Sequence, residues 1–287
     1  MKIKLSHLVV NGCSYTYGHG IADPIIDAWP SIIAKRLGVP LVNLALPGQG
    51  NTAIYRRTMQ YFYKDLFNDN HPFYIHAYSQ STRREVYIAK TQQFRIVGGD
   101  ISSEEVEREI ILNSDDHYYC LLQQDKLHRW ASINHLLDAH NVPHLMSDYM
   151  PETAGKVCDF QEEYETILLN ELALHPGKLQ NFSEVTNHLD KTPCLHETVE
   201  GHRYLADYIW KQIEKRYDDI EVVDLPHAKL HDILIHTPKT TEDLKSAHRN
   251  PVNYYPLDFC RNIYYFHELG LDYTKKNWAG RPKPQRP

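Results

Sequence analysis

The stretch Asn11-Gly12-Cys13-Ser14-Tyr15-Thr16-Tyr17-Gly18 follows directly on the apolar run Leu8-Val9-Val10. An apolar run that breaks into glycines and small polar residues predicts a β-strand ending in a tight turn, because glycine adopts backbone angles that other residues avoid. Two interpretations of Ser14 are open at this point. Its hydroxyl could cap the next helix, or it could carry chemistry at the carboxyl end of a strand, where the functional crevice of an open α/β sheet lies.

Strand-like and helix-like segments alternate up to residue 217. Apolar runs predict strands at residues 3–10, 39–45, 73–78 and 142–147, whereas residues 86–101 are ambiguous and are expected to form a loop or an excursion. Amphipathic spacing predicts helices at residues 27–37, 52–66, 118–140, 159–174 and 199–215. This alternation predicts a three-layer α/β/α domain, flavodoxin-like, in which helices cover both faces of a parallel sheet.

The composition is ordinary for a globular protein and argues against several functions. The net charge of −6 argues against a nucleic-acid-binding surface. Nothing approaches the ~18 consecutive apolar residues that a membrane span requires. The five cysteines are scattered, which fits neither a disulfide framework nor a zinc pattern. Because the chain also starts without a signal-like segment, we expect a cytoplasmic protein with no nucleic-acid or membrane partner.

The pattern changes after residue 217. Residues 218–287 are expected to form a C-terminal extension that packs on the domain of residues 1–217, with about eight disordered residues at the proline-rich end. Aromatic clusters at residues 254–256 and 263–266 could make this extension an assembly surface. A homo-oligomer and a virion partner are therefore both open.

Three further loops could supply partners for Ser14. The second and third predicted strands end in Pro47-Gly48-Gln49-Gly50-Asn51 and in Ser79-Gln80, and His196 precedes the last predicted helix. Acyl transfer to a serine needs a histidine base and hydrogen-bond donors aimed at the developing oxyanion. With 18 histidines in the chain, His196 alone is a weak signal. Cys194 close to it leaves a Cys–His pair open, although two residues apart on one loop is poor geometry.

Three of these segments together resemble the conserved blocks of the SGNH (GDSL-type) hydrolases. Residues 12–18 are similar to block I, written G-D-S-x-T-x-G, residues 43–51 resemble block II, and residues 196–202 resemble block V. The resemblance covers roughly residues 1–217 and is strongest to SGNH-like proteins of bacteriophages, which share the Trp29-Pro30 helix start. It implies the SGNH hydrolase fold and no metal or organic cofactor.

The resemblance also implies roles for single residues. Ser14 would be the nucleophile and His196 the general base, and the backbone N–H groups of Ser14 and Gly48 would form the oxyanion hole. Ser79 stands where the family has an asparagine donor. Asn51 and Arg83 are expected at the substrate, although a structural ion pair is the plainer expectation for Arg83.

The acid of the family lies three residues before the histidine, and that position is Pro193 here. Asp190 is the candidate if the loop folds back, and a backbone carbonyl or no acid at all are the alternatives. The resemblance implies a serine esterase for a small acyl group, with acetyl on a carbohydrate as the favoured ester. The alternative is a catalytically weak or inactive protein of this fold that binds glycans or serves in a phage particle.

Overall fold

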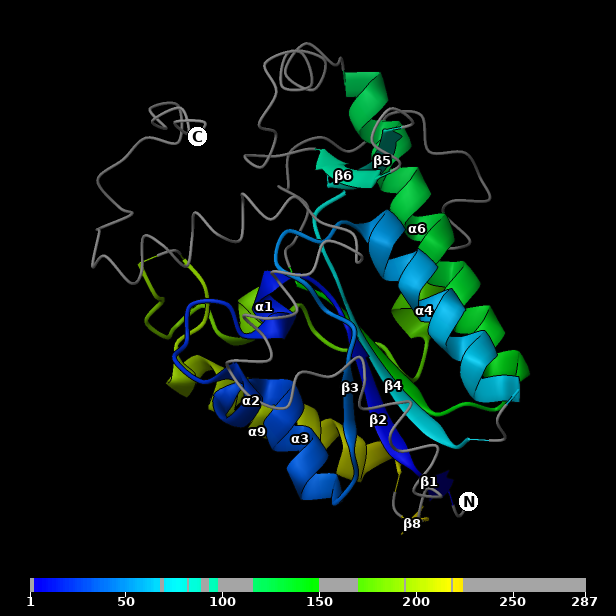
Figure 1. Ribbon diagram of the computed structural model, residues 1–287, viewed down its shortest axis with the longest axis vertical. Coiled ribbons are helices and arrows are strands. Elements are labelled where there is room, and N and C mark those ends of the chain that lie inside the picture. The colour runs from blue at the N-terminus through cyan, green and yellow to red at the C-terminus, as the bar shows by residue number, and fades with distance from the viewer. Residues whose placement is uncertain are drawn as a thin grey trace.

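The computed structural model describes residues 3–67, 70–81, 83–88, 93–97, 116–149, 170–193, 195–217 and 219–223 (Figure 1). Among these residues, no helix combines the length and the apolar character needed to cross a membrane. The strands are β1 (Ile3–Leu5), β2 (His7–Asn11), β3 (Leu41–Asn43), β4 (Pro72–Tyr78), β5 (Arg84–Ile88), β6 (Gln93–Val97), β7 (His144–Asp148) and β8 (Ile220–Val222). The helices are α1 (Ser14–Tyr17), α2 (Pro24–Asp27), α3 (Trp29–Leu37), α4 (Asn51–Phe67), α6 (Asp116–Ala139), α8 (Phe182–Val185) and α9 (Val199–Arg216).

The central sheet confirms the predicted parallel arrangement. Its four strands lie in the order β3-β2-β4-β7, and every neighbouring pair is parallel. Counted in chain order within this sheet, the arrangement is 2-1-3-4, as in flavodoxin-like folds. The chain first adds a strand on one side of β2 and then crosses to the other side. The carboxyl end of β2 is therefore the switch point at which such sheets bind ligands.

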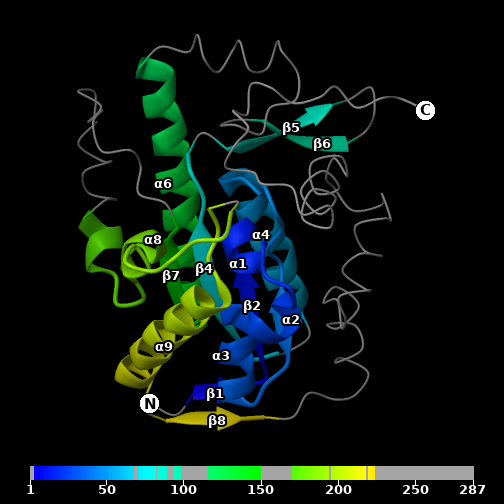
Figure 2. The same ribbon diagram turned by 90° about the vertical axis from the view of Figure 1, so that its left-hand side faces the viewer.

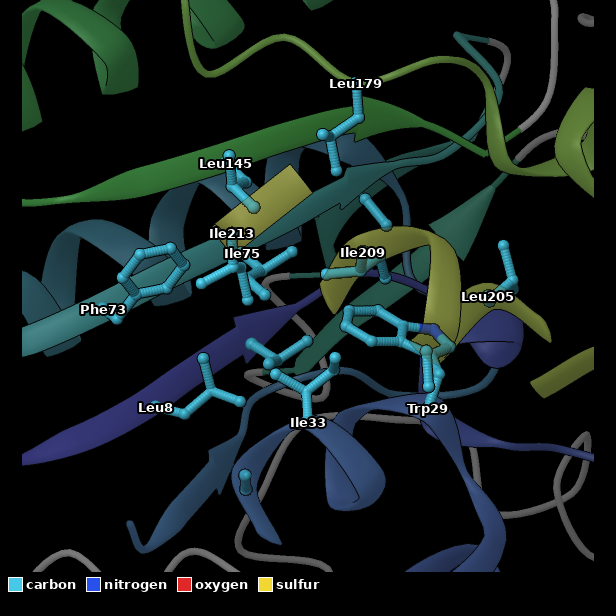
Figure 3. Packing of buried hydrophobic residues seen from close by; sticks show 14 of the residues in the cluster. Leu8, Trp29, Ile33, Phe73, Ile75, Leu145, Leu179, Leu205, Ile209 and Ile213 are labelled. Atoms are coloured by element: carbon cyan, nitrogen blue, oxygen red, sulfur yellow. The ribbon is translucent and has the colours of Figure 1, made fainter. Parts of the chain in front are cut away.

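Helices cover both faces of the sheet, which confirms the three layers (Figures 1 and 2). Successive side chains of a strand point to opposite faces, so Leu8 and Val10 join one core whereas Val9 joins the other. The first core lies under α3 and α9, and the second lies under α4 and α6. Figure 3 shows Trp29 of α3 packed among sheet and α9 residues in the first core.

The last helix shows how the sequence pattern becomes packing. Within the helix predicted at residues 199–215, a stripe of His202, Leu205, Ile209 and Ile213 is buried along α9. Because residues three and four apart share one face of a helix, these side chains all face α3 and the sheet. The Thr198 hydroxyl accepts a hydrogen bond from the Gly201 N–H and caps the start of α9, two residues after His196.

The strand predicted at residues 3–10 is in fact two strands, and this prediction was wrong in one respect. The strand breaks at Ser6, whose N–H donates to the His71 carbonyl and whose hydroxyl accepts from the His71 N–H. β1 then leaves the central sheet and pairs in parallel with β8. β8 lies in the stretch predicted as the C-terminal extension, so residues 219–223 run beside the start of the chain.

Two segments in which the sequence pattern predicts no helix or strand contain regular structure. The ambiguous residues 86–101 overlap the antiparallel pair β5–β6, which lies at the same end of the sheet as α1 in both views (Figures 1 and 2). Residues 176–193 contain α8, and Lys178 forms a parallel bridge with Met146 at the edge of β7. Predictions for residues 159–169, Cys194 and residues 224–287 lie outside the described residues.

Candidate active site

Ser14 lies at the first position of α1, directly beyond the carboxyl end of β2 (Figure 1). The turn between them requires glycine at position 12. A β-carbon there would lie 2.2 Å from Thr16 Oγ1 and 2.9 Å from the Ala77 carbonyl oxygen, closer than such atoms approach. Cys13, not Ser14, holds the N-cap position, and no side chain caps this helix. The capping interpretation of Ser14 is therefore wrong.

A buried asparagine supports the turn from behind. Asn11 Oδ1 accepts hydrogen bonds from the Gly12 N–H at 2.9 Å and from Gln49 Nε2 at 2.7 Å. Its Nδ2 donates to the Ile54 carbonyl and lies 2.9 Å from Thr58 Oγ1. One side chain thus connects the end of β2, the loop after β3 and α4. The sequence alone indicates no role for Asn11, since Gln49, Ile54 and Thr58 lie 38, 43 and 47 positions away.

The structure brings Ser14 and His196 together. His196 Nε2 lies 2.7 Å from Ser14 Oγ, although the two residues are 182 positions apart in the chain. This is the distance at which a nucleophile and its general base share a proton.

Two aromatic rings hold the imidazole of His196 in place. Tyr15 stacks on its face, with ring centroids 4.3 Å apart, and His19 meets it edge-on at 4.9 Å. Both residues belong to the first turns after β2, the His19 N–H donating to the Ser14 carbonyl at 2.9 Å. The segment that carries the serine therefore also fixes the ring of its partner. The sequence shows Tyr15 only as a variable position of the block I pattern.

The backbone around His196 forms a tight loop. The His196 N–H donates to Thr192 Oγ1 at 3.0 Å, and the Thr192 N–H donates to the His196 carbonyl at 2.8 Å. Leu195 adopts a φ of 64°, in the left-handed region that non-glycine residues rarely occupy. Strained conformations of this kind persist only where surrounding contacts hold them.

Glu197 supplies such contacts. Its side chain is 0 % exposed, and its two carboxylate oxygens lie 2.7 and 2.6 Å from Lys191 Nζ. Thr186 Oγ1 lies 2.7 Å from Oε1, and the Tyr149 hydroxyl donates to the same oxygen. A buried carboxylate is tolerated only when charge and hydrogen bonds compensate for the lost water. Glu197 therefore fixes the loop one residue from His196.

Tyr149 links this carboxylate to the ring stack. Burial, and then the neighbouring Glu197 carboxylate, raise the pKa of Tyr149 well above its ordinary value, so the phenol stays protonated and donates. The Tyr149 ring stacks on Tyr15 at 4.0 Å, and Tyr15 stacks on His196. A continuous chain of contacts thus runs from Glu197 through two tyrosines back to the imidazole. The only sequence signal for Glu197 is its place next to His196.

Asp190, the candidate acid, is exposed in the structure. His196 contacts Ser14, Tyr15, His19 and Thr192, and none of these four contacts involves Asp190. The loop folds back differently from the expectation: it brings Lys191, next to Asp190, onto Glu197. An acid role for Asp190 stays a prediction without a described contact.

Gly48 and Ser79, the remaining oxyanion-hole candidates, lie in the loops that follow β3 and β4, the two strands that flank β2. Gly48 is buried and has a φ of 80°, a left-handed angle that suits glycine. The Ser79 N–H donates to Asn51 Oδ1 at 2.8 Å, so only the buried Ser79 hydroxyl is left to donate elsewhere. As the first residue of a helix, Ser14 has a backbone N–H that no carbonyl of that helix accepts.

Asn51 and Arg83 were expected at the substrate. The Asn51 amide is buried, and besides accepting from Ser79 its Nδ2 donates to the carbonyls of Ser79 and Gln80. The Asn51 N–H donates to the Arg83 carbonyl at 3.3 Å. These bonds join the loop before α4 to the loop after β4. Direct contact of either side chain with a substrate stays a prediction.

The chain matches no protein-family model, and no curated protein is similar enough in sequence to be matched. In structure it is similar to several esterases and a GDSL-like lipase. The esterase EstA from Pseudoalteromonas sp. is 10% identical, with 75% of this chain and 100% of that chain covered and a TM-score of 0.47. A GDSL-like lipase from Bacteroides thetaiotaomicron is 13% identical, with 73% and 88% covered and a TM-score of 0.40. An acetyl xylan esterase from Butyrivibrio proteoclasticus is 12% identical, with 76% and 66% covered and a TM-score of 0.43.

Proposed function

We propose that the chain is a serine esterase of the SGNH type that works through an acyl-Ser14 intermediate. The observation that carries this proposal is the 2.7 Å contact between Ser14 Oγ and His196 Nε2 at the switch point of the sheet. Supporting observations are the position of Ser14 at the start of a helix and the rings that hold the imidazole.

In the proposed reaction, His196 Nε2 takes the proton of Ser14 while Oγ bonds to the ester carbonyl carbon. The carbonyl oxygen becomes negative and is stabilised by the N–H groups of Ser14 and Gly48, with the Ser79 hydroxyl as a third donor. The intermediate collapses, the alcohol leaves with the proton from His196, and the acyl group stays on Ser14. Water then attacks the acyl-enzyme and passes its proton to His196, and the released Ser14 oxygen recovers a proton from the imidazolium.

We infer that Ser14 and His196 act as a dyad. A catalytic acid has two tasks, to orient the imidazole and to stabilise its positive charge. Here the Tyr15 and His19 rings and the loop anchored by Glu197 orient the imidazole. The face of Tyr15, 4.3 Å from the ring, also favours the imidazolium through a cation–π interaction, worth about 0.5–2 kcal/mol.

The test of this proposal is Ser14→Ala, which should abolish turnover of an aryl acetate while the far-UV circular dichroism and the melting temperature stay near those of the wild type. Turnover retained in the folded variant would refute Ser14 as the nucleophile.

For the substrate we propose a small acyl ester, with acetyl on a carbohydrate as the first candidate, in keeping with the 20 tyrosines of the chain. A series of aryl acetates, butyrates and octanoates, followed by acetylated xylan, tests that choice.

Two observations favour the second candidate function, a weakly active or inactive glycan-binding protein. Asp190, the acid that the resemblance suggests, is exposed, and a serine stands in place of the family asparagine. This candidate predicts glycan binding that Ser14→Ala leaves unchanged, together with turnover no faster than that of the Ser14→Ala variant. A bacteriophage origin and a cytoplasmic location also remain proposals.

A further inference from the structure

We propose that Asp138, His144 and His175 form a binding site for a divalent transition-metal ion, with zinc as the first candidate. The three residues come from the end of α6, the start of β7 and the segment before Gly177. Their ligand atoms all lie within 4.8 Å of one another. Since the strands of the sheet are parallel and Ser14 follows the carboxyl end of β2, this cluster lies at the opposite end of the sheet from the proposed active site.

The main evidence for a bound metal is His144 Nε2, a buried lone pair without a hydrogen-bond donor among the described residues. The His144 side chain is 3 % exposed. Its Nδ1 lies 2.9 Å from the Val142 carbonyl oxygen, which can only accept, so Nδ1 carries the proton and Nε2 presents a lone pair. Nε2 is buried and has no hydrogen-bond partner among the described residues. The nearest carboxylate atom, Asp138 Oδ1, is 3.9 Å away and also accepts only.

A cation between these two atoms would satisfy both. His144 Nε2 presents its lone pair and Asp138 Oδ1 its carboxylate charge across 3.9 Å, and a metal ion can bind both atoms.

The spacing of the cluster suits an ion of this size. His175 Nε2 lies 3.0 Å from Asp138 Oδ2, and His144 Nε2 lies 3.9 Å from Asp138 Oδ1. Two ligands of one tetrahedral zinc ion at 2.0–2.1 Å are about 3.4 Å apart, between these values. Two imidazoles with one carboxylate suit zinc, nickel or copper, whereas calcium and magnesium prefer oxygen ligands alone.

His175 is the adaptable member of the cluster. Its ring stacks on His144 with centroids 5.0 Å apart, and its Nδ1 accepts the Gly177 N–H at 3.0 Å. Nε2 therefore holds the proton and donates to Asp138. Ligation through Nε2 moves this proton and gives up the Gly177 bond. The affinity should therefore depend more on His144 and Asp138 than on His175.

The experiment uses the full chain, stripped of metal with a chelator and then given zinc chloride or magnesium chloride. A metal that binds only the folded state stabilises it, so about 100 μM zinc should raise Tm by at least about 3 °C if the dissociation constant is micromolar. Magnesium should leave Tm unchanged. Cobalt(II) in place of zinc should give visible absorption bands of low-coordinate cobalt, which report the ligands directly.

Variants locate the metal. Asp138→Asn alters a side chain that is 52 % exposed, so it tests the site without disturbing the core. It and His144→Gln should abolish the zinc-dependent rise and the cobalt bands, whereas His175→Gln should weaken binding several-fold. The matched control is His135→Gln on the same helix, whose ring is 65 % exposed and 3.5 Å from Glu171. It should keep both signals.

Two results would overturn the proposal. One is a wild-type protein whose Tm and cobalt spectrum do not respond to metal. The other is a response that survives in Asp138→Asn or disappears in His135→Gln, which would move the metal to another group of surface side chains. None of these readouts depends on esterase activity.

Discussion

Replacing Glu197 by Gln should slow catalysis without touching either reacting residue. Gln has the same shape and still accepts from Tyr149, but it loses the charge that pairs with Lys191. Breaking a buried ion pair costs about 3–5 kcal/mol. The Lys191 side chain is 27 % exposed and can recover some water, so we expect a loss of about 2–3 kcal/mol in the free energy of unfolding.

The effect on catalysis follows from the position of His196. It is the next residue in the loop, and Leu195 before it is held at a strained φ of 64°. When the anchor weakens, the imidazole shifts, and a misplacement of about 1 Å can cost on the order of 100-fold in rate. We expect kcat for an aryl acetate to fall about 10- to 100-fold while KM stays within about two-fold. Lys191→Met should act in the same direction, because it leaves the carboxylate buried without its partner.

The matched control is Ile213→Ala. Ile213 is buried in α9, about 21 Å along the helix from its first residue. Its truncation should destabilise the fold by about 2–5 kcal/mol and leave kcat unchanged below the melting transition. Urea denaturation and steady-state kinetics at 20 °C or below separate the two effects. A wild-type kcat in Glu197→Gln, or an equal loss of kcat in Ile213→Ala, would refute the proposed role of Glu197 in positioning His196.

Three further predictions concern other parts of the molecule. Gly12→Ala should cost about 1–3 kcal/mol of stability and most of the activity, because its β-carbon would overlap Thr16; calorimetry and kinetics check this, and a fully active variant contradicts it. Asp190→Asn should keep at least about half of kcat, since the carboxylate is exposed and a dyad does not use it; a loss near 10⁴-fold would instead identify Asp190 as a catalytic acid. Burial lowers the pKa of His76 and of His202 to about 3, so between pH 6.5 and 3 the unfolded chain binds protons that the folded chain does not. The free energy of unfolding should therefore decrease as the pH is lowered through that range, by about 2 kcal/mol for each histidine at pH 5. His202→Gln should remove its share, and parallel curves for wild type and variant would count against this assignment.

The sequence predicts those parts of the fold that local periodicity encodes. The stripe on α9 and the apolar runs of β4 and β7 determine which faces are buried, and the parallel order follows from their alternation with helices. The break at Ser6 could not be predicted, because it depends on hydrogen bonds with His71, 65 residues away. The β5–β6 pair was equally hidden in a segment without a clear period.

For the site, the sequence indicates the proposed pair of Ser14 and His196 but not the residues that hold it. Ser14 and His196 stand in recognisable blocks, so their meeting was an expectation. The anchor of Glu197 is built from Tyr149, Thr186 and Lys191, which follow β7 and α8 in the chain. No spacing rule connects such residues, since only the folded chain brings them together. Conversely, closeness in sequence does not predict contact: Asp190 lies six residues before His196 but does not contact its ring among the described contacts.

The most direct test of the central claim is covalent labelling of the full chain with a fluorophosphonate, followed by mass spectrometry of its peptides. Only a serine activated by a base reacts quickly with such a probe. We expect one adduct, on Ser14, at a rate that falls at least 100-fold in His196→Gln and to zero in Ser14→Ala. A folded wild-type protein that stays unlabelled, or that carries the adduct on another residue, would contradict it.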